Sequence, residues 1–316
     1  MTDIAVIILV GQEKLHIRRC LERLRDLNPR SIFIVDCFST DGTQEIVKQY
    51  STEIGSGEAD EKSRLMPLAE AIGTVVHRQV AAGSNPSTVK SIAYSDEHCN
   101  GGRSSIQLVE HEWPGLYAKQ FNWALDNLPI NATWVLRLDA DEYLTPETIE
   151  RLTEELPKVP DDVTGLTLEL KRRFMGGEIR HGTSGIRLLR LFRHGVGRCE
   201  ERAMDEHIVL SRGRCADFAG AFYDDNLNSM DWWREKHRGY AKREAVDALA
   251  GEKFKASKTL YYKFPPYFRA FAYFCYRYFL RLGFLDGYAG WMWHFWQGLW
   301  YRCLVDREIA KLNSRT

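Results

Sequence analysis

The sequence predicts an α/β fold with a mostly parallel β-sheet, because strand-like and helix-like segments alternate through its first half. Short apolar runs of strand length are followed by segments whose apolar residues recur at helical spacing. Two of these runs, Ser31–Asp36 and Trp134–Asp139, end in an acidic residue. Ligands of parallel sheets bind beyond the carboxyl ends of the strands, so Asp36 and Asp139 stand where a ligand is expected.

The individual elements follow from periodicity and end signals. Thr145 begins ThrProGlu, a pattern that caps and starts a helix. Strands are predicted at Ile4–Val10, Ser31–Asp36, Trp134–Asp139, Gly165–Lys171 and Gly185–Phe192. Helices are predicted at Lys14–Leu27, Thr43–Tyr50, Thr145–Leu156 and Asp231–Ala250.

Two segments depart from this rhythm. Residues 51–105 are rich in Gly, Ser and Glu, which predicts an insertion or mobile loop with one short helix near Met66–Ile72. From Tyr261 to Leu304 the composition becomes strongly aromatic. We therefore divide the chain into an α/β domain, residues 1–250, and a helical tail, residues 251–316.

Composition excludes several classes of protein. The 43 basic and 43 acidic residues cancel, so nothing in the overall charge indicates nucleic-acid binding. The seven cysteines lack CxxC spacing, which argues against zinc or a disulfide framework and suits a reducing compartment. No signal peptide and no apolar run of about 20 residues is evident. The sequence thus predicts a soluble or membrane-associated protein.

The acidic turn Asp139-Ala-Asp141 follows a predicted strand. Two carboxylates on one short turn can face the same ligand, and oxygen ligands suit Mg²⁺ or Mn²⁺, which bridge carboxylates to substrate phosphates. Taken alone, the same turn is equally compatible with an ordinary solvated loop.

The segment Ile34–Thr43 reads IVDCFSTDGT and resembles the VD-x-x-S-x-D-G-T signature of family 2 glycosyltransferases, which have the GT-A fold. The DAD turn matches that family's metal motif. Between the two, Trp113–Leu125 (WPGLYAKQFNWAL) looks like the helix that leads into the metal strand. The resemblance covers nearly the whole chain except residues 51–105, and its nearest likeness is to bacterial enzymes that build cell-surface polysaccharide and lipopolysaccharide.

The resemblance implies roles for particular residues. Asp36 would contact the base or ribose of a nucleotide, and Asp41 would support that pocket. Asp141, assisted by Asp139, would bind the metal and the donor diphosphate. Two further residues would lie close to the donor, namely Lys119 and Asn122. Many relatives have a second acid where this chain has Cys37, so base recognition at that position departs from the family pattern.

An acid pair, Asp205 and Glu206, precedes His207. Transfer with inversion needs a base that takes the proton of the acceptor hydroxyl, and the family carries an acidic base at about this point. The sequence does not choose between the two acids. His207 is a candidate metal ligand, and an orienting or purely structural role is the alternative.

The segment Asp217–Ala245, which includes most of the predicted helix at 231–250, resembles the acceptor-side segment of the same enzymes. Its aromatic side chains would stack on sugars, and Lys236 or His237 would meet phosphate. Ordinary packing of the helix on the sheet is the alternative, above all for the tryptophans Trp232 and Trp233.

The tail predicts contact with a membrane surface. Residues 253–285 hold seven basic residues and no acid, and Arg269, Arg277 and Arg281 project within about a third of the helical circle. Tryptophans between residues 288 and 304 favour the headgroup layer. Anionic cytoplasmic leaflets would add attraction, which predicts a peripheral protein on the cytoplasmic face of the inner membrane. The alternative is a helical hairpin, broken at Gly283–Gly287, that packs on the domain or on another subunit of a homo-oligomer.

The sequence therefore predicts an inverting, metal-dependent glycosyltransferase of the hexosyltransferase type. It would use Mn²⁺ or Mg²⁺ and a nucleotide-sugar, with UDP the family's commonest nucleotide, to modify a lipid-linked or cell-surface glycan. A sugar nucleotidylyltransferase is disfavoured because Gly11–Lys14 lacks a glycine-rich phosphate loop. A non-catalytic membrane scaffold with a degenerate transferase fold stays open as an alternative, and a processive synthase would need spanning helices.

Overall fold

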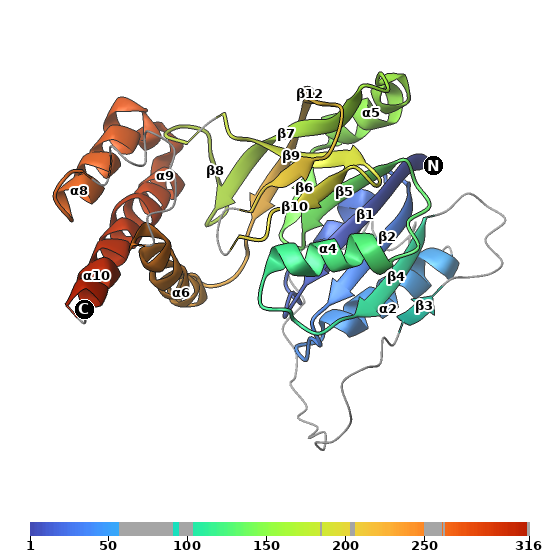
Figure 1. Cartoon of the computed structure of the whole chain (residues 1–316), viewed down its shortest axis with the longest axis horizontal. Coiled ribbons are helices and arrows are strands. Elements are labelled where there is room, and N and C mark those ends of the chain that lie inside the picture. Colours follow the sequence, from blue (N-terminus) through green and yellow to red (C-terminus); the bar gives the residue numbers. More distant parts are fainter. Residues whose placement is uncertain are drawn as a thin grey trace, which may run out of the picture.

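A computed structural model describes residues 1–56, 91–94, 104–183, 185–202, 206–249, 261 and 263–314. A mixed β-sheet carries helices on both faces, and further helices form a bundle at one end of it (Figure 1). The predicted α/β class and the helical C-terminal segment are thereby confirmed. The predicted short helix near Met66–Ile72, and most of the predicted insertion at 51–105, lie outside the described residues.

The main sheet has ten strands in the order β3-β4-β2-β1-β5-β9-β7-β12-β6, with β8 paired to β7. β1 lies parallel to both β2 and β5, whereas β9 runs antiparallel to β5. The strands of the first half are β1 (Thr2–Val10), β2 (Pro29–Asp36), β3 (Ser91–Tyr94), β4 (Ser105–Glu110) and β5 (Trp134–Asp139). Those of the second half are β6 (Glu142–Leu144), β7 (Val163–Phe174), β8 (Gly177–Ile179), β9 (Arg187–Arg193) and β12 (Arg214–Asp225). A separate pair joins β10 (Gly197–Cys199) to β11 (Ile208–Leu210).

Both faces of the central strands are buried, as a parallel sheet requires. On β1, Ile4, Val6 and Ile8 belong to one hydrophobic core, and Ala5, Ile7 and Leu9 belong to the other. The first core includes α1 (Ile17–Leu24), α2 (Thr43–Ser56) and α5 (Pro146–Glu155), followed by the 3₁₀ turn η1 (Leu156–Lys158). The second includes α4 (Tyr117–Asn127). As predicted, Thr145 caps α5 by accepting a hydrogen bond from the Thr148 N–H at 3.3 Å.

The first helix starts three residues later than its periodicity predicts. α1 begins at Ile17, whereas the helix was expected from Lys14. The Glu13 and Lys14 N–H groups instead donate to side chains of the loop after β2, namely Thr43 Oγ1 and Asp41 Oδ2. Because these long-range bonds already occupy the N–H groups, the segment stays outside the helix.

The C-terminal bundle packs on the hairpin formed by β7 and β8. It consists of α6 (Met230–Leu249), α8 (Phe268–Cys275), the π-helical η2 (Tyr276–Leu280), the 3₁₀ turn η3 (Gly283–Asp286), α9 (Gly287–Trp293), the π-helical η4 (His294–Trp300) and α10 (Tyr301–Asn313). Phe174 and Ile179 of the β7–β8 hairpin share a hydrophobic cluster with Trp233 and Trp293. The predicted break between residues 283 and 287 and the helical hairpin are both confirmed. None of the helices in the described ranges is long and apolar enough to cross a membrane.

The prediction that three arginines form an exposed basic face on the tail is wrong for Arg269 and Arg277. Arg269 is buried and its guanidinium binds Asp306 of α10, with Nε 2.9 Å from Oδ1. Arg277 is also buried and donates to Gln297 Oε1 at 2.5 Å. Arg281 is exposed. Arg269 and Arg277 share the side of α8 and η2 that faces α10 and η4, so apolar residues face solvent.

Packing also explains most of the aromatic residues for which sugar or headgroup contact was the competing interpretation. Trp293 is buried against Phe174, with ring centroids 5.2 Å apart. Trp233 is buried and stacks on the His237 ring at 3.5 Å. Burial lowers the pKa of His237 to about 4, so this imidazole is neutral near pH 7 and is a poor ligand for phosphate. Among the tail tryptophans, Trp291 is exposed.

The buried ion pair of the tail should be costly to break. Replacing Asp306 by Ala leaves the buried Arg269 guanidinium without its carboxylate, and we expect a loss of about 3–5 kcal/mol in the free energy of unfolding. Urea unfolding followed by circular dichroism measures it. The double variant Arg269→Met/Asp306→Leu should recover most of the loss, and equal destabilisation of both variants would contradict this account.

Candidate active site

The carboxyl ends of three adjacent strands bring the predicted residues together. Val10 pairs with Asp36 of β2, and its neighbour Leu9 pairs with Asp139 of β5. Because neighbouring strands lie about 4.8 Å apart, Asp36 and Asp139 flank β1 at roughly 10 Å. The chain order reverses between β1 and β5, which makes this edge a topological switch point, where open α/β sheets bind ligands.

Asp36 is fully buried and its carboxylate is held by its own loop. Oδ2 accepts hydrogen bonds from the Ser39 N–H at 2.9 Å and from Gln44 Nε2 at 2.6 Å, and Oδ1 accepts from the Ser39 hydroxyl. Gln44 also binds Glu110 Oε1 at 2.8 Å. A ligand group that contacted Asp36 would have to replace one of these donors, so the carboxylate fixes the loop in the structure described.

The loops after β1 and β2 are tied to each other. Asp41 Oδ1 accepts from the N–H and the hydroxyl of Thr43, while Oδ2 accepts from the Lys14 N–H at 3.1 Å. The Gln12 N–H donates to Ser39 Oγ at 2.9 Å. The N–H groups of residues 12–14 are thus occupied by side chains, which is unlike a phosphate-binding loop, whose N–H groups face the phosphate.

Two buried arginines control the acidic turn. Arg137 of β5 reaches Asp139 at 4.0 Å, and Arg190 of β9 reaches it at 3.8 Å. Burial tends to raise the pKa of Asp139, but these two guanidinium groups outweigh it and hold the pKa below its ordinary value. Arg190 also binds Glu142, whose Oε2 accepts the Asp139 N–H at 3.0 Å. Asp139 therefore stays ionised with its side chain 41% exposed, in a fixed position.

The pKa of Asp141 is raised, in contrast to that of Asp139. Burial and the nearby Asp224 and Asp139 carboxylates raise its pKa to about 6, although the Asn226 amide donates to Oδ2 at 2.8 Å. β12 brings Asp224 and Asn226 here because it pairs antiparallel with β6, with Asp224 opposite Glu142. A bound cation would favour ionisation of this carboxyl group, which the neighbouring acids oppose.

Glu206 lies beside the same arginine. Arg137 Nη2 donates to Glu206 Oε1 at 2.9 Å, so one guanidinium contacts both Glu206 and Asp139. Arg137 Nη1 lies 3.1 Å from the Cys199 sulfur at the end of β10. Asp205, the other predicted base, lies outside the described residues. His207 is exposed, and its carbonyl accepts the Glu200 N–H at 2.9 Å.

Asn122 of α4 holds this segment in place. Its amide oxygen accepts the Cys199 N–H and its amide nitrogen donates to the Cys199 carbonyl, both at 2.9 Å. The side chain thus anchors the strand that leads to Glu206, and its predicted contact with a donor stays a prediction. Lys119 lies on the exposed side of α4, and its predicted role likewise stays a prediction.

A different lysine faces the acidic turn. Lys236 of α6 lies over the Trp232 ring at 4.6 Å, and its charge helps to lower the pKa of Asp139. Burial tends to lower the pKa of Lys236, but surrounding hydroxyls and carboxylates outweigh it and raise the pKa. These neighbours are Tyr240, Tyr117, Asp141 and Glu13. The C-terminal bundle therefore supplies a cation to the sheet edge.

The part of the chain that the structure describes contains no group of three His, Cys, Asp or Glu side chains that could hold a metal. The predicted set of Asp139, Asp141 and His207 is thus not assembled as a three-ligand site. Mg²⁺ and Mn²⁺ commonly take one or two carboxylates and complete their coordination with substrate phosphates and water. Asp139, which stays ionised, and Asp141, whose ionisation is opposed by neighbouring acids, are two carboxylates that fit that arrangement.

Several residues of the site were not predicted from the sequence. Arg137 sits inside the apolar run WVLRLD, and a charge in a buried strand is a usable signal because it needs a carboxylate partner. Arg190 and Asn226 gave no comparable signal, since strand pairing between distant segments brings them to the turn.

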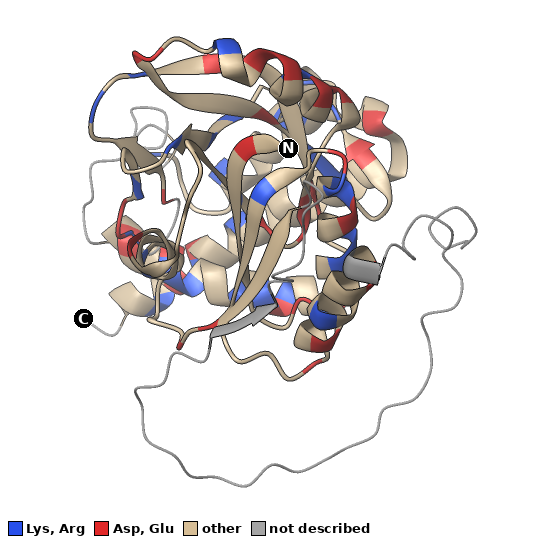
Figure 2. Ribbon diagram, turned by 90° about the vertical axis from the view of Figure 1, so that its right-hand side faces the viewer, with Lys and Arg blue, Asp and Glu red and all other residues tan. Residues whose placement is uncertain are grey.

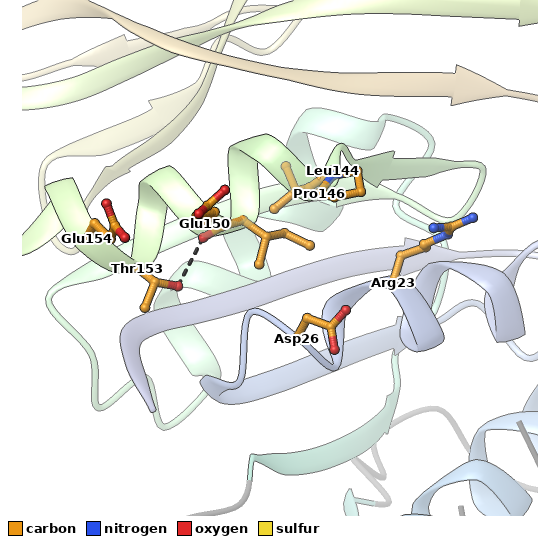
Figure 3. Close-up of a pocket in the computed structure, with 8 residues that line it drawn as sticks. Arg23, Asp26, Leu144, Pro146, Glu150, Thr153 and Glu154 are labelled. Atoms are coloured by element: carbon orange, nitrogen blue, oxygen red, sulfur yellow. Dashed lines mark hydrogen bonds between the residues drawn. The ribbon is translucent and has the colours of Figure 1, made fainter. Parts of the chain in front are cut away.

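Two hollows elsewhere on the surface are less suited to a nucleotide-sugar. One, of about 310 Å³, lies between α1 and α5 and is lined by three carboxyl groups, from Asp26, Glu150 and Glu154, against the single cation Arg23, a balance that disfavours phosphate (Figure 3). The other, of about 550 Å³, includes Thr133 and Arg193 and lies at the amino end of β5, away from the acidic turn. Charged residues of both signs are interspersed over the ribbon as a whole (Figure 2).

Comparisons with known proteins give weak likenesses. No protein-family model and no curated protein matches the chain. A crystal structure of S. aureus TarS aligns with a TM-score of 0.41 and 14% identity, covering 98% of this chain and 89% of that one. The mannosyltransferase PcManGT from Pyrobaculum calidifontis, in complex with GDP-Man and Mn²⁺, aligns with a TM-score of 0.41 and 13% identity over 100% of this chain and 76% of that one. HddC from Yersinia pseudotuberculosis aligns with a TM-score of 0.31 and 11% identity, covering 71% of this chain and 93% of that one. Likenesses this weak do not identify a function, which has to be inferred from the site itself.

The raised pKa of Asp141 gives a stability signature. Its ordinary pKa is 3.8, and the folded chain raises it to about 6, so the metal-free protein loses stability as the pH rises through this window. Asp141→Asn removes that loss. We expect the variant to be more stable than the parent by about 3 kcal/mol at pH 8, with the difference vanishing below about pH 3. Thermal unfolding in EDTA measures it.

The exposed Asp26 provides the matched control, because Asp26→Asn removes one carboxylate away from the acidic turn. Its stability difference from the parent should be small at both pH values. A pH-independent difference for Asp141→Asn would contradict the proposed repulsion.

Proposed function

We propose that this chain is an inverting, GT-A-like glycosyltransferase that moves a sugar from a nucleotide-sugar to a glycan acceptor. The observation that carries the proposal is the shared edge of β1, β2 and β5. The loop of Asp36 lies on one side of β1, and the acidic turn with Glu206 lies on the other. A nucleoside diphosphate laid across this edge would place its nucleoside near Asp36 and its diphosphate near Asp141.

In this proposal Asp139 and Asp141 hold Mn²⁺ or Mg²⁺ together with the donor diphosphate. The cation, when bound, offsets the charge that builds on the leaving diphosphate. Lys236 adds a second positive charge on the same side, supported by its raised pKa. Asp41 and Asp36 keep the two loops in register for the nucleoside, through the hydrogen bonds described above.

Glu206 is the proposed base. Its carboxylate takes the proton of an acceptor hydroxyl, whose oxygen bonds to the anomeric carbon as the bond to the diphosphate oxygen breaks on the opposite face. The product inherits the inverted configuration, and the electron pair leaves with the nucleoside diphosphate. Arg137 and the Asn122–Cys199 clamp position Glu206, since both contact the segment that carries it.

UDP is our first candidate for the nucleotide, and a lipid-linked or cell-surface glycan is our candidate acceptor. Neither is read from the fold. Half-buried Cys37 accepts a hydrogen bond from Gln120 at 3.4 Å, so any base recognition there differs from recognition by an acid.

Asp141→Asn should lose metal-dependent nucleotide binding. The substitution would remove one of the two carboxylates proposed to hold the cation, so Mn²⁺ should no longer strengthen binding. Calorimetric titration of UDP and of GDP, each with and without Mn²⁺, measures this. Unchanged Mn²⁺-dependent binding in this variant would place the metal elsewhere.

Glu206→Gln should separate binding from transfer. The amide keeps the shape but cannot take a proton, so we expect kcat to fall by roughly 10²–10⁴-fold with donor affinity unchanged. Release of nucleoside diphosphate in the presence of acceptor measures kcat. The exposed neighbour Glu201 serves as the control, and Glu201→Gln should behave as the parent. Equal activity of both variants would remove Glu206 from the mechanism and point to Asp205.

A further inference from the structure

Residues 264–291 form an apolar surface on the outer side of the C-terminal bundle. Half of the large apolar side chains that the described chain exposes fall in this short range. Six of them have exposed fractions of 55–75%, namely Phe268, Phe271, Phe279, Leu280, Leu285 and Tyr288. We call this surface the apolar face. Single exposed apolar residues are normal, but a dense group of this kind marks an interaction site.

The apolar face is one continuous side of α8 and η2. Phe268, Phe271 and Phe279 recur at helical spacing, and the positions between them that turn inward carry Arg269, Phe274 and Arg277. η3 contacts η2, α9 contacts η3, and these two elements carry the exposed Leu285 and Tyr288. In Figure 1 these helices stand at the end of the molecule farthest from β3 and β4.

The charges on this surface are all positive where they are exposed. Lys263 and Arg281 are exposed. The single acid between residues 263 and 291 is Asp286, whose carboxylate turns inward and accepts the Arg180 and His181 N–H groups, both at 2.9 Å. An apolar surface that is rich in exposed aromatic rings, with exposed cations and no exposed acid in the same stretch of chain, complements the headgroup layer of an anionic bilayer.

We propose that the apolar face inserts into the surface of an anionic phospholipid bilayer and holds the protein there as a peripheral membrane protein. Insertion of aromatic and aliphatic side chains supplies most of the binding, and Lys263 and Arg281 add electrostatic attraction. A second copy of the chain is a poorer occupant. A two-fold contact through this face would set the same cations against each other, with no exposed acid of the face to pair with them.

The bundle also joins this surface to the proposed catalytic edge. α6 packs on α10 through Ala241, Tyr301 and Val305, and the same helix presents Lys236 to the acidic turn. If the apolar face binds a bilayer, the same packed bundle therefore connects the acceptor side of the proposed site to that bilayer. The membrane contact itself is independent of the proposed reaction.

Co-sedimentation of the full chain with vesicles tests the proposal, using phosphatidylcholine alone and phosphatidylcholine with phosphatidylglycerol. We expect binding to the anionic vesicles. Phe271→Ser/Leu280→Ser should lower the partition coefficient by about tenfold or more, because both side chains insert. Val209→Ser/Val246→Ser removes apolar side chains of 50% and 55% exposure elsewhere and should bind as the parent.

Removing charge should have a smaller and lipid-specific effect. Lys263→Gln/Arg281→Gln should weaken binding to anionic vesicles by roughly fivefold for each lost cation and leave the weak binding to neutral vesicles unchanged. Unaltered circular dichroism and metal-dependent nucleotide binding would show that each variant is folded.

Two results would overturn the proposal. Phe271→Ser/Leu280→Ser binding to vesicles as tightly as the parent would show that the apolar face does not insert. A dimer in lipid-free sedimentation that this variant dissociates would show that a second copy covers the face. Either result leaves the nucleotide-binding and transfer measurements interpretable, because neither uses lipid.

Discussion

The charge balance at the carboxyl end of β5 constrains much of this structure. Arg137 and Arg190 are buried, and a buried guanidinium is tolerated when carboxylates and ring faces surround it. Arg137 takes Asp139 and Glu206 as partners, and Arg190 takes Asp139 and Glu142. Each arginine also lies over a phenylalanine ring. These contacts fix three carboxylates that would otherwise repel one another, but they leave the Asp141 carboxylate against Asp139 and Asp224. Repulsion between these acids raises the pKa of Asp141, and this is the feature on which the proposed binding of a divalent cation depends.

The rest of the fold positions this cluster. The parallel strands β2, β1 and β5 set the two predicted ligand-binding loops at one level of the sheet. The antiparallel pair β6–β12 returns the chain to the acidic turn with Asp224 and Asn226, while the Asn122–Cys199 clamp fixes the approach to Glu206. Helix α6 then connects the site to the bundle that carries the apolar face. The proposed donor site, base and membrane surface therefore depend on one continuous framework.

Sequence patterns predicted the parts of this framework that are local. The strand Trp134–Asp139, the cap at Thr145 and the break near Gly283 were all visible, because each is set by neighbouring residues. The position of Asp36 and Asp139 at one edge also followed, since parallel strands share a carboxyl end. The partners of the acids did not follow, because Arg190 and Asn226 reach Asp139 and Asp141 through pairing of distant strands.

The tail shows a second kind of limit. Periodicity put Arg269, Arg277 and Arg281 on one side of a helix, and the first two are indeed on one side, but the pattern could not say which side faces solvent. The orientation is set by Asp306 and Gln297, which lie far from the arginines in sequence. They bind Arg269 and Arg277 inside the bundle. The surface that remains is apolar, so any contact with a membrane relies on insertion more than on charge.

The most direct test of the proposed donor site is a crystal structure of the protein grown with UDP and Mn²⁺, with diffraction collected at the manganese absorption edge. Our account predicts an anomalous peak beside the carboxylates of Asp139 and Asp141, with the diphosphate against it and the nucleoside beside the Asp36 loop. A bound nucleotide whose Mn²⁺ lies away from the acidic turn, for example in the hollow at the amino end of β5, would contradict it.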